Sequence, residues 1–430
     1  MNKTIAFQTF GCKLNFSETS AISRELKSHG FLLVEWNEPA DVYVINSCSV
    51  TGNAEKKCKT VIRQAKKRNP LAKIAVVGCF SQLKPVELSN MDEVDIVLGS
   101  SEKFNLYHHL QQIFQTSDKE VSAGSILKDK RFFPSYSLGD RTRSFLKIQD
   151  GCDYFCSYCT IPMARGRSRS GSVSQTIELA KEIGQTDIQE VVLTGVNIGD
   201  FGKGTEENFF SLLKELDKVE GIERIRISSC EPDLLTDEII EFVAASKKFM
   251  PHFHIPLQSG SDNVLKLMKR RYPRQRFADR VKKIKELMPN ACIAADVIVG
   301  FSGESPEDFQ DSFNFIDSLD ISYVHVFTFS ERPGTVAVNM DGKVDGAEKK
   351  RRSQELHSLS ERKKIEFYNS FIGQEVTVLF EADVHDGHIQ GFSDNYLRVK
   401  VEFQAGLRNK IKRVNLLNID EDGVFLAKVI

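Results

Sequence analysis

Short apolar runs alternate with longer amphipathic stretches along the first hundred residues. Each apolar run has the length of a buried β-strand, and each amphipathic stretch carries apolar residues at helical spacing. The predicted strands are residues 5–7, 42–45, 74–77 and 96–98, and the clearest predicted helices are residues 18–29 and 55–68. This alternation is typical of a doubly wound parallel sheet. Residues 107–139 are polar and lack sustained periodicity, which predicts a linker before a second domain that begins near Arg141.

The same alternation restarts after the predicted linker. Strands are predicted at residues 145–148, 190–193, 224–227, 252–255, 293–299 and 323–327, with helices between them that include residues 175–183 and 277–287. Six such repeats predict a partial TIM-type (βα)6 barrel. Active sites of these folds lie at the carboxyl ends of the strands. The loops that follow the strands are therefore the places to search for chemistry.

The end of the chain follows a different pattern. Residues 348–366 are densely charged and predict an exposed connecting helix. Residues 373–430 contain short alternating runs separated by glycines, which predict a small β-barrel. We therefore predict an α/β multidomain protein with domains at residues 1–125, 138–368 and 369–430.

Composition narrows the class of protein only slightly. The 430 residues carry a formal net charge of −1, so overall charge neither indicates nor excludes a polyanionic partner. Residues 1–10 are too short and polar for a signal peptide, and no apolar run is long enough to cross a bilayer. We expect a cytoplasmic protein without a membrane partner. Its nine cysteines are odd in number and scattered, which argues against a disulfide framework and suggests metal binding.

Three cysteines share the loop that follows the first predicted strand of the second domain. Cys152, Cys156 and Cys159 are spaced so that one loop can bind three corners of a [4Fe–4S] cluster, which leaves the fourth iron open. Such an iron can chelate S-adenosylmethionine and deliver the electron that cleaves it. The alternative is a structural zinc loop, but no nearby Cys or His pair completes a tetrahedral site. The spacing is that of the radical S-adenosylmethionine superfamily.

A second set of cysteines follows the strands of the first domain. Cys12, Cys48 and Cys79 each come just after a predicted strand. Because parallel strands end at the same edge of a sheet, these thiols should converge, and together they could hold a second cluster. The alternative is three unrelated core thiols. The other cysteines fit no such pattern and are interpreted as incidental or buried thiols: Cys58, Cys230 and Cys292.

Several motifs, in order along the chain, resemble the radical S-adenosylmethionine methylthiotransferase family. They are TFGCKLN (9–15), NSCSVT (46–51), GCDYFCSYCTIP (151–162), RGRSRS (165–170), PLQSGS (256–261) and DVIVGF (296–301). The resemblance covers essentially the whole chain. It implies an amino-terminal cluster domain, a central radical domain and a carboxyl-terminal TRAM domain, in agreement with the three predicted domains.

The resemblance also implies a reaction with two [4Fe–4S] clusters and two molecules of S-adenosylmethionine. The cluster on Cys12, Cys48 and Cys79 would carry the sulfur, which one S-adenosylmethionine methylates. The other S-adenosylmethionine, at the Cys152 cluster, would generate the radical that removes hydrogen from adenine C2. An electron donor and a sulfur source are further implied partners, and the sequence identifies neither.

Within the family, the motifs look most like those of MtaB-type enzymes, which act on threonylcarbamoyl-adenosine beside the tRNA anticodon. The alternatives are methylthiolation of isopentenyl-adenosine or of a ribosomal protein, and, from another class, a non-catalytic iron–sulfur RNA-binding protein. By superfamily position, the implied cofactor contacts are Tyr158, Thr194, Gly195, Glu231, Val299 and Gly300.

A basic run at residues 266–285 is the strongest sign of an RNA partner. Its cations could bind phosphates of the anticodon arm, and the interleaved Tyr272 and Phe277 could stack on a base. The alternative is a solvated helix face. The TRAM-like barrel should add only a modest contribution to RNA binding, because its acidic residues slightly outnumber its basic ones. The predicted RNA-binding side chains are Lys269, Arg270, Arg271, Arg274 and Arg276.

Overall fold

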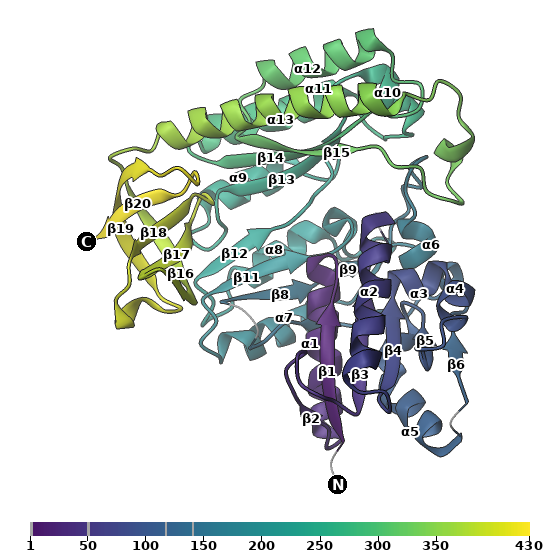
Figure 1. Cartoon of the computed structure of the whole chain (residues 1–430). Helices are drawn as coiled ribbons and strands as arrows, with labels where there is room; N and C mark the ends of the chain where they lie inside the picture. The colour runs from purple at the N-terminus through teal and green to yellow at the C-terminus, as the bar shows by residue number, and fades with distance from the viewer. Residues whose placement is uncertain (1–2, 50–51, 117, 140–141) are drawn as a thin grey trace.

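The computed structural model describes residues 3–49, 52–116, 118–139 and 142–430. Its amino-terminal domain is a doubly wound parallel sheet, as predicted, with the strand order β2-β1-β3-β4-β5-β6. Helices α1 and α5 cover one face of this sheet and α2 covers the other (Figure 1). The strands are β1 (Thr4–Thr9), β2 (Leu32–Leu33), β3 (Val42–Ser47), β4 (Lys73–Gly78), β5 (Ile96–Leu98) and β6 (Glu120–Ser122). The helices are α1 (Lys13–Ser28), α2 (Gly52–Arg68), α3 (Cys79–Leu83), α4 (Pro85–Ser89) and α5 (Leu106–Thr116).

Part of the predicted linker is regular structure, so the prediction for residues 107–139 was wrong in part. Leu106, Leu110 and Ile113 recur at helical spacing and bury one face of α5 in the core of the amino-terminal domain. Strand β6 then pairs with β5 at the edge of the sheet. The backbone hydrogen bonds of an edge strand leave little trace in its side-chain pattern, which is why the periodicity did not reveal it.

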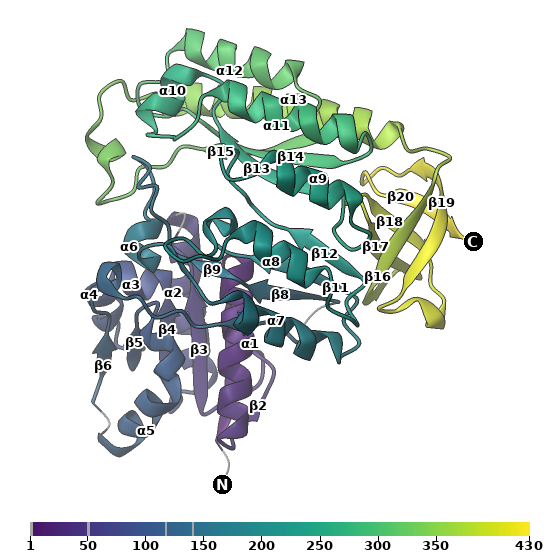
Figure 2. The same ribbon diagram turned by 180° about the vertical axis from the view of Figure 1, so that it is seen from behind.

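The central domain is a partial barrel of parallel strands with helices on its outer face (Figures 1 and 2). Among the described residues, the barrel consists of two sheets that separate between β12 and β13. Only isolated bridges, at Ile225–Phe249 and Ser229–His254, connect the two sheets there. The antiparallel β7 pairs with β8, so the central sheet begins before the predicted start near Arg141, which lies outside the described residues. The strands are β7 (Ser135–Tyr136), β8 (Arg143–Lys147), β9 (Gln149–Asp150), β10 (Arg169–Ser170), β11 (Glu190–Thr194), β12 (Arg224–Ile227), β13 (His252–Gln258), β14 (Cys292–Val299) and β15 (Tyr323–Thr328). The helices are α6 (Ile161–Arg165), α7 (Val173–Gly184), α8 (Phe209–Leu216), α9 (Asp237–Ala245), α10 (Asp262–Leu267), α11 (Arg274–Leu287), α12 (Pro306–Ser318) and α13 (Gly346–Asn369).

The carboxyl-terminal domain is the predicted small β-barrel, closed in the order β16-β17-β18-β20-β19. Arg224 and Arg226 of β12 donate hydrogen bonds to its backbone carbonyls and fix it to one end of the central domain. In the part of the chain that the structure describes, no helix has the length and apolar character needed to span a membrane. The strands are β16 (Glu375–His385), β17 (His388–Ser393), β18 (Arg398–Glu402), β19 (Ile411–Ile419) and β20 (Phe425–Val429).

Buried ion pairs join the amino-terminal and central domains. The carboxylate of Glu18 on α1 lies 2.6 Å from Lys103, 2.7 Å from Lys147 and 3.1 Å from Arg165. Asp150 pairs with the same Lys147 and Arg165, each at 2.9 Å. Burial alone would raise the pKa of Glu18, but the three cations outweigh it and hold that pKa well below its usual value. Because removing one member would strand a buried charge, this network fixes how the two domains sit against each other.

Candidate functional site

Cys152, Cys156 and Cys159 lie on the loop between β9 and α6, at the carboxyl end of the first parallel barrel strand. Gly151 starts this loop with a φ of 72°. A Cβ atom at Gly151 would lie 2.0 Å from the carbonyl oxygen of Arg167, so the turn requires glycine. The chain can therefore turn sharply and place three thiols within nine residues of the end of β9.

The sulfur atoms of this loop accept hydrogen bonds. Backbone amides donate to Cys152 and Cys159, each over 3.4 Å, and the guanidinium of Arg270 donates to Cys156 over 3.1 Å. Burial raises the pKa of both Cys152 and Cys159 to about 12. Such thiols become thiolates when a bound metal compensates their charge. The donors and the spacing fit a [4Fe–4S] cluster with three protein ligands.

Arg270 is held in place by groups around it. It forms an ion pair with Glu231 and donates to the hydroxyl of Tyr272 over 2.9 Å. Its side chain is only 3% exposed. Burial raises the pKa of Glu231, and Arg270 counteracts that effect. Glu231 therefore orients the cation that touches the Cys156 sulfur.

The second cysteine set gathers at one edge of the amino-terminal sheet. Cys12 caps the start of α1, Cys48 follows β3, and Cys79 begins α3. A Cβ atom at Gly11 would lie 2.9 Å from the Cys48 sulfur, so Cys48 packs against the residue before Cys12. Burial raises the pKa of Cys79, Arg165 lowers it, and the Cys12 thiol is near enough to act on the same group. The predicted convergence of these strand ends is therefore present in the fold, and the role of these thiols as ligands stays a prediction.

The two cysteine sets are joined by one pair of packed helices. Helix α3, which begins at Cys79, packs against α6, which begins two residues after Cys159. The hydroxyl of Ser100 donates to the carbonyl of Ala164 over 2.6 Å and adds a hydrogen bond across this contact. The amino-terminal sheet edge and the radical loop are therefore neighbours, although their cysteines are far apart in the sequence.

A cavity of about 230 Å³ lies beside Cys159 at the carboxyl ends of β13, β14 and β15. Tyr158 forms part of its wall, together with Arg332 from the loop after β15. Arg332 donates to the carbonyl of Ser49 over 2.6 Å. Because Ser49 follows Cys48, this one side chain connects the cavity wall to the second cysteine set. The wall of this cavity therefore reaches from Cys159 to the loop that follows Cys48.

Polar side chains from three neighbouring strands cluster next to this cavity. His254 Nε2 lies 2.8 Å from Asp296 Oδ1, and Asp296 also lines the cavity. Ligand atoms of His254, Asp296 and His325 all lie within 4.8 Å of one another. Burial lowers the pKa of His325, and His254 adds to the effect. The inner face of the barrel is therefore polar where the strands approach the cavity.

One of the predicted cofactor contacts lines this cavity, namely Tyr158. Glu231 is instead paired with Arg270, and Gly300 donates its amide to Glu304 over 2.7 Å beneath the side chain of Lys349. The contacts of the whole set with S-adenosylmethionine stay predictions. The predicted contacts that do not line the cavity are Thr194, Gly195, Glu231, Val299 and Gly300.

The structure divides the predicted RNA-binding residues. Lys269 and Arg276 are exposed, which suits contact with phosphate. The prediction that Arg270 contacts RNA is wrong, because its buried guanidinium is already bound by Glu231 and Cys156. The predicted stacking aromatics are also wrong, since Tyr272 is 4% exposed and Phe277 is fully buried.

The two remaining arginines of that set have protein partners. Arg271 donates to the carbonyl of Asp153 over 2.6 Å, and Arg274 pairs with Asp311 at 2.7 Å. Both keep exposed surface, so their contact with RNA stays a prediction.

Sequence reasoning missed several residues that shape the site. Arg332 could have been flagged, because a charged residue before Pro-Gly in a strand-end loop is a recognisable signal. Glu18 and Lys147 carried no such signal, since a charge within a helix or strand usually faces solvent. Only the packing of two domains puts them inside.

Comparisons with known proteins agree with this geometry. Residues 146–316 match the family model described as Radical SAM superfamily, and residues 4–99 match Uncharacterized protein family UPF0004. The chain resembles a solved structure of the radical S-adenosylmethionine methyltransferase TsrM from Kitasatospora setae, with a TM-score of 0.57 and 13% identity. That similarity covers 78% of this chain and 77% of the other, and it concerns the fold alone.

Two curated relatives match over most of their length. The threonylcarbamoyladenosine tRNA methylthiotransferase MtaB of Bacillus subtilis is 38% identical over 424 residues, which cover 96% of this chain and 94% of that protein. The tRNA-2-methylthio-N(6)-dimethylallyladenosine synthase of Acetivibrio thermocellus is 30% identical over 427 residues, which cover 96% of this chain and 88% of that protein.

The fold and the cysteine loop define an enzyme of the radical S-adenosylmethionine superfamily, whose cofactors are S-adenosylmethionine and a [4Fe–4S] cluster. The match to curated relatives over nearly the whole chain narrows this class further. The chain belongs to the radical S-adenosylmethionine methylthiotransferase family.

Proposed function

We propose that this enzyme converts N6-threonylcarbamoyladenosine beside the tRNA anticodon to its 2-methylthio form. The observation that carries the proposal is the packing of α3 against α6, which brings the strand-end cysteines of one domain next to the radical loop of the other. A radical generator beside a second cysteine triad suits insertion of sulfur into a C–H bond. The curated relative from Bacillus subtilis carries the name of this activity, and this supports the choice of base.

In this proposal two clusters bind to the two cysteine sets. Cys152, Cys156 and Cys159 hold the cluster that cleaves S-adenosylmethionine, and the other triad holds a second [4Fe–4S] cluster that supplies sulfur. The second triad consists of Cys12, Cys48 and Cys79. The reaction also needs an electron donor and a sulfur source, both of which act as partners.

Charge near the second triad supports this arrangement. Glu18 and Asp150 carry two negative charges, whereas Lys103, Lys147 and Arg165 carry three positive charges in the same buried network. Arg169 adds a fourth cation, at 3.2 Å from Asp150. An excess of buried cations stabilises nearby thiolates and an anionic cluster. Arg165 and Lys103 are also the cations that lower the pKa of Cys79.

Mass spectrometry of tRNA nucleosides tests the proposal. A deletion strain should lack 2-methylthio-N6-threonylcarbamoyladenosine, and the wild-type chain should restore it. The variants Cys156→Ala and Cys48→Ala should fail to restore it, whereas Cys58→Ala is a matched control, because Cys58 is a buried core thiol. Unchanged 2-methylthio-N6-threonylcarbamoyladenosine in the deletion strain would rule the proposal out.

A second candidate is methylthiolation of N6-isopentenyladenosine, which the Acetivibrio thermocellus relative favours through its name. Loss of that nucleoside alone in the deletion strain would select this candidate. A non-catalytic RNA-binding protein predicts a different result. The reduced, reconstituted protein would then form no 5′-deoxyadenosine from S-adenosylmethionine.

A further inference from the structure

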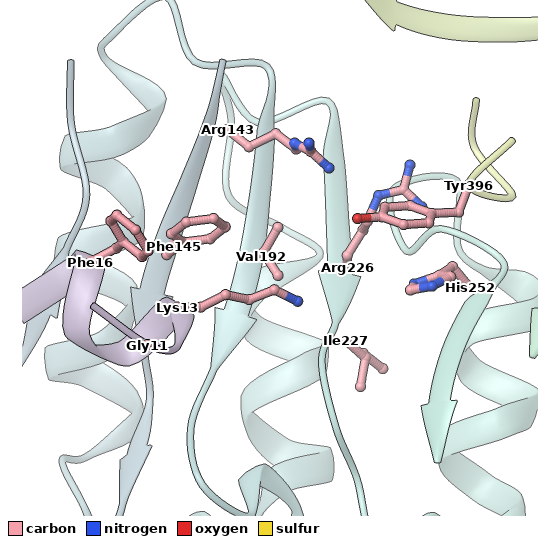
Figure 3. Close-up of a pocket in the computed structure, with 10 residues that line it drawn as sticks. All are labelled: Gly11, Lys13, Phe16, Arg143, Phe145, Val192, Arg226, Ile227, His252 and Tyr396. Carbon is pink, nitrogen blue, oxygen red and sulfur yellow. The ribbon is translucent and has the colours of Figure 1, made fainter. Parts of the chain in front are cut away.

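A second cavity lies at the junction of the three domains (Figure 3). Its volume is about 210 Å³. Gly11 and Lys13 reach it from the start of α1, beside Cys12, and Tyr396 reaches it from the carboxyl-terminal barrel. Phe16 of α1 also lines it, and the barrel strands β8, β11, β12 and β13 supply the other lining residues: Arg143, Phe145, Val192, Arg226, Ile227 and His252.

The two arginines of this cavity are engaged by protein groups. Arg226 binds Glu190 at 2.9 Å and donates to the carbonyls of Asp394 and Ser393 over 2.7 and 2.6 Å. Arg143 binds Glu381 at 2.9 Å. These guanidinium groups hold the domain junction together.

Two other polar groups of the cavity have no hydrogen-bond or ion-pair partner among the residues that the structure describes. Among the described residues, none forms a hydrogen bond or ion pair with the ammonium group of Lys13, whose side chain extends into the cavity in Figure 3. His252 is 9% exposed, and its Nδ1 atom is buried without a hydrogen-bond partner in the same part of the chain. The ring of His252 stacks on Tyr396, with centroids 4.3 Å apart. The ammonium group of Lys13 is exposed at the mouth of this concavity and therefore accessible to a ligand, while the buried, unpartnered ring nitrogen of His252 is costly without one.

Strand β13 contributes residues both to this cavity and to the one beside Cys159. His252 and His254 lie two residues apart on β13, so their side chains share a face of the strand, and the register of β13 shifts between Pro256 and Gln258 farther along it. Gln258 lines the cavity beside Cys159, and His254 binds Asp296, which lines it too. One polar face of β13 thus leads from the radical loop to Lys13.

We propose that the Lys13 cavity is a subsite for an anionic group of the tRNA substrate. This inference rests on the proposed function. An exposed, unpaired ammonium group in a concave site that it shares with Arg143 and Arg226 favours a negative partner, and the volume exceeds the roughly 150 Å³ of a cavity that accepts benzene. Two groups of the substrate have this chemistry. One is the carboxylate of the threonylcarbamoyl substituent, and the other is a backbone phosphate next to the modified base.

Binding of two tRNAs to the reconstituted holoenzyme tests the subsite. One tRNA carries threonylcarbamoyl-adenosine, and the other carries plain adenosine at the same position. The variants are Lys13→Gln, Lys13→Arg and His252→Phe, which keeps an aromatic ring against Tyr396. Lys218→Gln is the matched control, because Lys218 is exposed on the outer surface. Iron content and thermal unfolding are measured for every variant.

Lys13→Gln should weaken binding about tenfold or more, and Lys13→Arg should retain most of the affinity. If the carboxylate is the ligand, only the tRNA with the threonylcarbamoyl group loses affinity. If a phosphate is the ligand, both tRNAs lose affinity alike. The slope of the logarithm of affinity against the logarithm of salt concentration then decreases in magnitude by about one. Either result supports the subsite.

The inference is overturned if Lys13→Gln and His252→Phe bind both tRNAs as wild type does. If Lys13→Gln loses iron because of its position beside Cys12, His252→Phe decides alone, since it is remote from the cysteines in sequence. A wild-type enzyme that binds neither tRNA would instead count against the proposed function.

Discussion

Arg332 donates a hydrogen bond of 2.6 Å to the carbonyl oxygen of Ser49 and so joins the central domain to the loop after Cys48. The same guanidinium pairs with Glu55 at the start of α2. Arg332 is 8% exposed and forms part of the cavity wall beside Cys159. The side chain of Arg332 therefore contacts both the cavity beside Cys159 and the loop that follows Cys48.

Replacing Arg332 should uncouple the cleavage of S-adenosylmethionine from the methylthiolation of the substrate. In Arg332→Ala, we expect 5′-deoxyadenosine to form, while the ratio of methylthiolated product to 5′-deoxyadenosine falls about tenfold or more. Glu55 keeps its ion pair with Lys84 at 2.7 Å, so the loss of stability should be about 1–3 kcal/mol. Arg362→Ala, at an exposed position on α13, should leave the ratio unchanged. An unchanged ratio in Arg332→Ala would show that Arg332 has no positioning role.

Glu18→Gln should be strongly destabilising. The substitution leaves Lys103, Lys147 and Arg165 with a deficit of negative charge in a buried network, which costs about 3–5 kcal/mol. Thermal unfolding measures the effect. Glu25→Gln on the same helix is the control and should change stability by less than about 0.5 kcal/mol, because Glu25 is exposed. Equal melting temperatures for the two variants would contradict the importance of the network.

Stability should depend on the protonation of His252. Burial, reinforced by Arg226 and Lys13, holds its pKa well below the usual value of about 6.5. The unfolded chain therefore takes up a proton near that pH and the folded chain does not. This contribution to stability is fully present above pH about 6.5 and is lost as the pH falls below it, by up to about 1.4 kcal/mol per pH unit.

The variant His252→Phe removes this titration. Between pH about 7.5 and about 5.5, the wild-type melting temperature should fall relative to that of His252→Phe. His357→Phe, at an exposed site on α13, should run parallel to wild type. A constant difference between wild type and His252→Phe across this range would mean that His252 does not titrate on unfolding.

Iron content should separate the two cysteine sets. The wild-type protein should bind about eight iron atoms per chain, and loss of either triad should leave about four. The variants Cys12→Ala and Cys152→Ala each remove a ligand of one proposed cluster. Cys58→Ala should keep about eight, since burial raises the pKa of Cys58 to about 12 and the thiol stays protonated in the core. About four iron atoms in the wild-type protein would exclude the second cluster.

Arg270 should tune the redox potential of the radical cluster. Its hydrogen bond to the Cys156 sulfur favours the reduced, more negative cluster. If Arg270→Leu removes about 1.4 kcal/mol, the one-electron potential should fall by about 60 mV. A redox titration followed by electron paramagnetic resonance measures this shift. Arg276→Leu is the exposed control, and a potential equal to that of wild type in Arg270→Leu would refute the tuning role.

Much of the fold was predictable because it depends on local patterns. The strands β3, β4, β11 and β12 are apolar runs of the expected length, so their positions follow from the sequence alone. Edge strands such as β6 were not predictable in this way. Their stability comes from backbone pairing with a neighbour, which leaves no periodic signal.

The sequence by itself determined where the two cysteine sets lie along the chain, and it predicted their chemistry. The spacing of Cys152, Cys156 and Cys159 and the strand-end positions of the other triad are local features, readable without coordinates. Only the tertiary structure decided which charged side chains are buried and which partners they bind. Arg270 looked like an RNA contact and is instead buried against Cys156, and Arg332 meets Ser49 across 283 residues of chain. A charge can be buried only where packing supplies its partner, and that partner is set by the three-dimensional arrangement of the domains.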